Sequence, residues 1–166
     1  RNYGDEKHLS TGQLWDVINA YRLGVHKLAL MFGLGTDDAH NYHDLAVGQS
    51  NTGRGWVMVR AKSLTPESII AAMESGDFYA SSGVAVDGIR LARSTYSFRI
   101  QPEKGVTYTT WFIGTRKNFK SSPDLAKRNS LKPSEAGIGE ILGQSQSLEP
   151  SYTFNGDELY VRAEIM

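Results

Sequence analysis

The sequence contains no cysteine. This absence excludes disulfide scaffolds, thiolate zinc sites, iron–sulfur clusters and cysteine nucleophiles. It assigns no cellular compartment, because cysteine-free proteins occur on both sides of membranes. An excess of charge of one sign is also missing, since 18 Lys and Arg residues balance 18 Asp and Glu residues. A net charge of zero argues against binding to nucleic acid or another polyanion.

Long hydrophobic runs are equally lacking. No stretch approaches the roughly 18 consecutive apolar residues that a membrane-spanning helix needs. The chain of 166 residues, with 40% hydrophobic and 22% charged residues, has an ordinary globular composition and is long enough to bury a core. It begins Arg1-Asn2-Tyr3-Gly4, with neither an initiator Met nor an apolar leader. We therefore expect it to be a piece of a longer protein.

Residues 1–77 have the pattern of an α/β region. Ser10 and Gln13 form a capping box, which predicts a helix starting at residue 11. The nearly continuous apolar run 27–34 predicts a strand buried on both faces, as in a parallel sheet or barrel. A second strand is expected over 56–61. The alternation of helix and strand favours an α/β fold for this part.

A second helix completes this part. Thr65 is the expected N-cap, Pro66 occupies the first helical position and Gly76 ends the helix. These three residues are typical of a helix with well-defined ends.

Residues 78–166 have the pattern of a small antiparallel β-sandwich or sheet. Short apolar runs separated by Gly, Pro and polar turns follow one another. The clearest predicted hairpin joins 152–154 to 159–165 across Asn155-Gly156, and its second strand alternates so that one face is buried and one is wet. Residues 115–150 are polar and show no motif. We expect domain boundaries of 1–77 and 78–166.

Potential metal ligands gather after the apolar run. The four histidines are His8, His26, His40 and His43. Two of them fall in the polar segment 35–55, which we expect to be a functional loop at a strand end. Asp38 and His40 are two residues apart, so in an extended backbone both side chains face the same side. A carboxylate beside an imidazole suits zinc, manganese or iron. Asp-x-His also occurs by chance in ordinary loops.

Other chemistries have less support. Ser81-Ser82-Gly83 lacks the surrounding pattern of a nucleophile elbow. Gly53-Arg54-Gly55 is only superficially similar to a phosphate loop, because the Walker lysine and the following helix are missing.

A longer series of motifs resembles a known family. Leu14-Trp15-Asp16, Gly35-Thr36-Asp37-Asp38-Ala39-His40 and Gly55-Trp56-Val57-Met58-Val59 occur in this order. Leu64 to Ile70 and Gly76 to Gly83 continue the series. Together they resemble the C-terminal part of a PHP-domain protein, in the polymerase and histidinol phosphatase superfamily of metal-dependent phosphoesterases. The resemblance covers about residues 9–90.

The resemblance implies a fold and a metal site. The family fold is a distorted (β/α)7 barrel, so 1–77 would be its C-terminal remnant and 78–166 a β-rich C-terminal domain. The family's metal ligands include an early His-x-His and a late Asp-x-His, of which only the late motif is present here, at Asp38 and His40. The polar or aromatic residues expected close to that site, without being ligands, are Asp37, His43 and Trp56.

The resemblance also implies an activity. The parent protein would hydrolyse phosphate monoesters or diesters with divalent zinc, manganese or iron. This chain would supply the last ligand motif and would be incomplete as an enzyme alone. Its expected partners are the rest of the barrel and a small phosphoester substrate, with no role for a membrane or nucleic acid. An incomplete barrel exposes strand edges, which favours self-association into homo-oligomers.

Two other interpretations stay open. The β-rich part could be a module that binds a glycan or another ligand, attached to a degenerate PHP scaffold that holds no metal. It could also be a structural appendage that packs on the barrel and shapes its entrance. Loss of metal affinity in the parent would favour the first of these.

Overall fold

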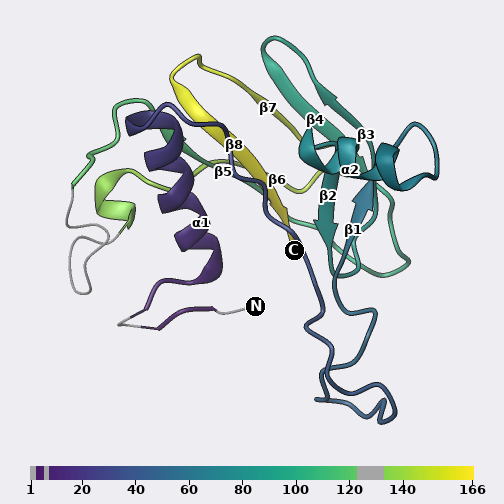
Figure 1. The fold of residues 1–166 in the computed structure, drawn as a ribbon. Coiled ribbons are helices and arrows are strands. Elements are labelled where there is room, and N and C mark those ends of the chain that lie inside the picture. Colours follow the sequence, from purple (N-terminus) through teal and green to yellow (C-terminus); the bar gives the residue numbers. More distant parts are fainter. Residues whose placement is uncertain (1–2, 6–7, 123–132) are drawn as a thin grey trace. The chain divides into compact units, whose positions relative to one another are not determined.

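The computed structural model describes residues 3–5, 8–122 and 133–166 and is mainly β-structure (Figure 1). Within these ranges, strands β1 to β8 form three small antiparallel sheets, accompanied by two short α-helices. None of the described helices has the length and apolar character needed to cross a membrane. The chain divides into two compact units. We call Phe32–Ala85 the central unit, and Arg1–Met31 together with Val86–Met166 the β-rich unit.

The first helix belongs to the β-rich unit. Helix α1 (Thr11–Ala20) begins at Ser10, whose hydroxyl accepts a hydrogen bond from the Gln13 amide, while the Gln13 side chain accepts one from the Ser10 amide. The predicted capping box is thus confirmed. The helix continues as a π-helical turn over Tyr21–Val25. The expected boundaries 1–77 and 78–166 stay a prediction, because contacts group segments without assigning domains.

Two three-stranded sheets form the body of the β-rich unit. The first contains β3 (Val86–Leu91), β4 (Thr95–Ile100) and β7 (Ser151–Thr153), in the order β3-β4-β7. The second contains β5 (Thr110–Arg116), β6 (Glu140–Ser145) and β8 (Glu158–Ile165), in the order β6-β5-β8. All pairings are antiparallel. The β-rich character predicted for the second half of the chain is confirmed.

Aromatic rings join the two sheets. Phe112 of β5 lies with its ring centroid 6.0 Å from that of Tyr96 in β4 and 5.5 Å from that of Tyr152 in β7. Phe98 joins the same cluster, and Phe98 and Phe112 are 5% and 1% exposed. Burial of such rings is the main source of stability in a core of this size. Sheet-on-sheet packing of this kind is compatible with a small β-sandwich.

The predicted hairpin at the end of the chain is wrong. Strand β7 pairs with β4 and strand β8 pairs with β5, so Asn155-Gly156 links two different sheets. The Glu158 carboxylate explains why the chain turns there without pairing. It accepts hydrogen bonds from the amides of Asn155 and Gly156 and from the Tyr152 hydroxyl. The turn was located correctly, but a side chain, rather than a strand ladder, holds it.

The polar segment 115–150 contains regular structure that its composition does not indicate. Strand β6 pairs with β5 along its length, and a short 3-10 helix, η3, spans Pro133–Ala136. Ala136 and Ile138 are 2% exposed and pack with Ala20 of α1. Part of the segment, 123–132, lies outside the described residues.

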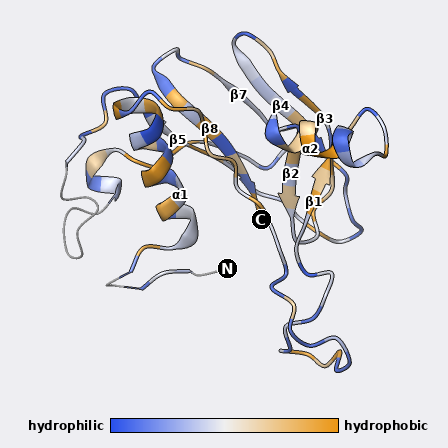
Figure 2. Cartoon of the chain, in the orientation of Figure 1, coloured by the Kyte–Doolittle hydropathy of each residue, from blue (hydrophilic) through white to orange (hydrophobic). Residues whose placement is uncertain are grey.

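The central unit contains two paired strands and one helix. Strand β1 (Trp56–Val59) pairs antiparallel with β2 (Phe78–Ser81), and α2 (Pro66–Glu74) connects them. Figure 2 colours both strands orange, in keeping with their apolar sequences. The predicted cap is confirmed, since the Thr65 hydroxyl accepts a hydrogen bond from the Ser68 amide. The described pairings are antiparallel, so these sheets show no remnant of a parallel barrel.

The buried strand predicted over 27–34 is wrong. These residues form no strand, and Leu28, Phe32 and Leu34 are 50%, 41% and 60% exposed. The backbone of Met31 is held by a side chain instead. The fully buried Asn19 accepts a hydrogen bond from the Met31 amide and donates one to its carbonyl. These bonds occupy groups that a strand ladder would otherwise use.

Candidate functional site

The candidate site lies on a long loop of the central unit, residues 35–55, which leads into β1 (Figure 1). Its two arms run side by side. The Gly53 amide donates to the Asp37 carboxylate at 2.6 Å, and the amides of His40 and Asn41 both donate to the Ser50 carbonyl at 2.9 Å. These cross-arm bonds close the loop although it lacks strand or helix structure.

Glycine permits the close approach at the base of this loop. A Cβ at Gly55 would lie 2.8 Å from the Thr36 carbonyl oxygen, and one at Gly35 would lie 3.3 Å from the Trp56 carbonyl oxygen. The first distance is below what real Cβ atoms show, so a side chain at residue 55 would force the arms apart.

A buried amide pins the outer part of the loop. Asn51 is 6% exposed, and its side-chain nitrogen donates to the carbonyls of Asn41 and Asp44 at 3.1 and 2.6 Å. Its side-chain oxygen accepts a hydrogen bond from Arg54 at 3.2 Å. Both donors of this buried amide and its oxygen thus have partners within the loop, as buried polar groups require.

Asp38 and His40 are in contact through the Asp38 backbone, and not in the extended geometry expected from the sequence. Asp38 has a φ of 50°, in the left-handed region, so the two side chains do not follow strand alternation. The contact runs instead from the His40 ring to the backbone: Nδ1 lies 2.6 Å from the Asp38 carbonyl oxygen. Both side chains are exposed.

This contact determines the tautomer of the neutral His40 ring. A carbonyl oxygen can only accept, so Nδ1 must carry the proton and donate. In the neutral ring Nε2 is then left with a free lone pair. Histidines that bind metals commonly donate their second ring N–H to a backbone carbonyl in this way.

The other predicted residues take different places. Asp37 closes the loop through its bond to Gly53, which is a structural role next to the candidate ligands. His43 is exposed in the outer part of the loop. Trp56 begins β1 and is 36% exposed. The prediction that these three lie near a metal site stays a prediction.

The donor set fits part of a metal site. Asp38 and His40 supply one carboxylate and one imidazole, which suit zinc, manganese or iron. Within residues 3–5, 8–122 and 133–166, no group of three or more His, Cys, Asp or Glu side chains could hold an ion. Zinc sites normally have three or four protein ligands. Two donors would therefore need completion from elsewhere.

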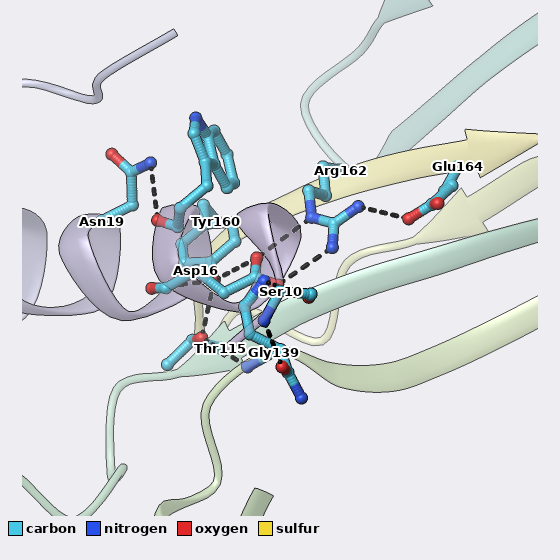
Figure 3. Close-up of polar contacts among 10 residues, drawn as sticks. Ser10, Asp16, Asn19, Thr115, Gly139, Tyr160, Arg162 and Glu164 are labelled. Carbon is cyan, nitrogen blue, oxygen red and sulfur yellow. Dashed lines mark hydrogen bonds and ion pairs between the residues drawn. The ribbon is translucent and has the colours of Figure 1, made fainter. Parts of the chain in front are cut away.

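A second polar centre was not foreseen from the sequence. Asp16 of α1 accepts two hydrogen bonds from Arg162 of β8, from Nε at 3.0 Å and from Nη2 at 2.9 Å (Figure 3). It also accepts one from the Tyr160 hydroxyl, which in turn accepts one from Thr115. The Asp16 side chain is only 4% exposed, so this is a buried ion pair with satisfied oxygens.

Helix α1 covers the face of β8 that the sequence pattern placed in solvent. Tyr160 is 8% exposed, and the side chains of Arg162 and Glu164 are 23% and 17% exposed. The expected wet face is thus wrong, because its polar groups find partners on the helix and on one another. The Arg162 guanidinium also lies 5.8 Å from the ring centroid of Trp15.

The electrostatics of this centre fix its charges. Burial, and then the charge of Asp16, raise the pKa of Tyr160 far above its ordinary range. Burial lowers the pKa of Arg162, but the hydrogen bonds and charge of Asp16 outweigh this and raise it overall. The tyrosine therefore stays neutral and the arginine charged across the physiological range, which suits a structural clamp and not proton transfer.

Comparisons of the chain with family models, with curated proteins and with solved structures found no match.

Proposed function

We propose that Asp38 and His40 are ligands of a divalent metal ion. The observation that carries this proposal is the 2.6 Å contact between His40 Nδ1 and the Asp38 carbonyl oxygen. It holds the ring in the tautomer that leaves Nε2 free to bind a metal, and it makes one residue of the pair orient the other. The hydrogen bonds between the two arms of the loop hold the backbone around Asp38 and His40 in place.

We further propose that the chain is the C-terminal part of a PHP-type, metal-dependent phosphoesterase. The support is the ordered series of motifs around Gly35 to His40 and Gly55 to Val59, together with the local geometry of the first of them. A bound metal would polarise a phosphoryl oxygen and lower the pKa of water. The missing ligands would come from the part of the parent protein outside this chain. Alone, the chain would bind metal weakly.

The test compares variants in the full-length parent. Asp38→Ala and His40→Ala should each reduce hydrolysis of a chromogenic phosphate monoester or diester by more than about 100-fold, because each removes a metal ligand, and loss of a residue that only orients a ligand already costs about 10- to 100-fold. His43→Ala is the matched control, since it removes a histidine from the same loop that is not proposed as a ligand. Normal turnover in both ligand variants would refute the proposal.

The binding-module alternative lacks comparable support. The rings described in the core of the β-rich unit pack against one another, where they cannot stack on a sugar. A binding module would need an exposed aromatic or polar platform. The alternative would move to first place if the parent held no metal.

A further inference from the structure

Arg54 is the only lysine or arginine between residues 35 and 55, a segment that also contains Asp37, Asp38 and Asp44. Its described partner is the Asn51 side-chain oxygen, which uses one of the five guanidinium N–H groups. No carboxylate in the described part of the chain forms an ion pair with it. A charged side chain in this state retains donors for a ligand.

Arg60 is a useful contrast, because its charge is already paired with an acid. Arg60, just after β1, donates to the Asp77 carboxylate at 2.5 Å and is neutralised by it. Both side chains belong to the central unit and both are exposed. They differ in that Arg54 is bound to a neutral amide and Arg60 to an acid.

The cross-arm hydrogen bond places Arg54 and the candidate metal ligands on facing arms of the same loop. The Gly53 amide donates to the Asp37 carboxylate. Arg54 directly follows Gly53 on one arm, and Asp38 directly follows Asp37 on the other. A further cross-arm bond runs from the His40 amide to the Ser50 carbonyl. A cation and a carboxylate–imidazole pair are therefore held by the same closed loop.

We propose that Arg54 binds the non-bridging oxygens of the phosphoryl group in the substrate of the Asp38–His40 site. This inference rests on the proposed function. A phosphate ester that approaches a loop with three aspartates needs positive charge in addition to the metal, and Arg54 is the loop's own source. The planar guanidinium matches two phosphate oxygens at once. This is recognition by a side chain, unlike the backbone cradle of a phosphate loop.

The test uses the 166-residue chain, inorganic phosphate as the probe, and amide NMR that also resolves the arginine Nε–H groups. Phosphate should cause a saturable shift of the Arg54 Nε–H and of the Gly53 and Gly55 amides, with chloride at equal ionic strength as the salt control. Arg54→Gln should weaken phosphate binding by about tenfold or more, the loss expected for a charge-assisted hydrogen bond. Arg60→Gln, the matched control, should leave it unchanged.

Two further measurements make the result decisive. The amides of His40 and Asn41 report whether the loop stays closed in Arg54→Gln, and Arg54→Lys should retain part of the affinity because it keeps the charge. Phosphate binding that is absent, that does not saturate, or that is equal in wild type and Arg54→Gln would overturn the inference. A zinc titration of the full-length parent and of its His40→Ala variant separates the two proposals. If zinc fails to affect His40 in the parent, the metal proposal fails. If zinc binds through His40 but Arg54→Gln leaves phosphate binding unchanged, only the present inference fails.

Discussion

Arg162 and Asp16 are 146 residues apart in the chain, yet Nη2 of the arginine lies 2.9 Å from Oδ2 of the aspartate. This contact joins the first helix to the last strand. The whole of the central unit lies between the two residues along the chain. The helix therefore belongs to the β-rich unit, and the central unit is an insertion between its two parts.

Breaking this pair should destabilise the β-rich unit strongly. We expect Asp16→Ala to lower the free energy of unfolding by about 3–5 kcal/mol, because the largely buried Arg162 would lose both bonds to Asp16 and keep only its ion pair with Glu164. Denaturant unfolding of the chain measures the change. Asp77→Ala is the control: it removes the acid from the exposed Arg60 pair and should cost about 0–1 kcal/mol. Similar losses of unfolding free energy in both variants would show that burial of the Asp16–Arg162 pair adds nothing to its effect on stability.

The Glu158 turn should make stability depend on acid pH. Burial alone would raise the pKa of Glu158, but hydrogen bonds from the Asn155 amide and the Tyr152 hydroxyl outweigh it and lower the pKa from 4.5 to about 2. The folded state therefore binds this proton more weakly than the unfolded state. The contribution of the Glu158 carboxylate to the free energy of unfolding is present above pH 4.5 and is lost as the pH falls towards 2.

Glu158→Gln tests that dependence. Between pH 5 and pH 2, unfolding free energies of the variant should fall less steeply than those of the wild type, since the titrating group is gone. The amide of glutamine retains one acceptor, so the loss at neutral pH should be about 1 kcal/mol. Parallel pH profiles would contradict the role of the carboxylate. Glu149→Gln, which removes an exposed carboxylate, is the control.

Asn51 should keep the loop of the candidate site closed. Asn51→Ala leaves the carbonyls of Asn41 and Asp44 without their described side-chain donor, at a cost of about 1–3 kcal/mol to local closure. We expect faster amide hydrogen exchange at His40 and Asn41, whose N–H groups cross the loop. Thr52→Ala, at an exposed neighbour, should leave exchange unchanged. Unchanged exchange in Asn51→Ala would mean that the loop is held by other contacts.

Local signals in the sequence predicted local structure well. The capping box at Ser10 and the Thr65-Pro66 start of α2 are both confirmed, because a helix end is decided by residues within one turn. The turn at Asn155-Gly156 was also located. The pairing around it was not, since strand partners depend on residues elsewhere in the chain, and the Glu158 carboxylate is what shapes the turn.

Burial could not be inferred from apolar character alone. The run 27–34 is apolar but is held by Asn19 and exposes several side chains, whereas the polar face of β8 is covered by α1. Both outcomes depend on contacts between residues distant in sequence, which periodicity does not record. For the candidate site, the sequence shows the residue types at 38 and 40, but the ring contact that orients His40 depends on the left-handed backbone at Asp38, which residue types do not indicate.

Metal content tests the central claim most directly. The full-length parent, purified without chelators, should be analysed by elemental mass spectrometry beside its Asp38→Ala, His40→Ala and His43→Ala variants and beside the 166-residue chain. The account predicts bound zinc, manganese or iron in the parent and in His43→Ala, a clear loss in the other two variants, and little metal in the chain alone. Full metal content in both Asp38→Ala and His40→Ala, or no metal in the parent, would contradict it.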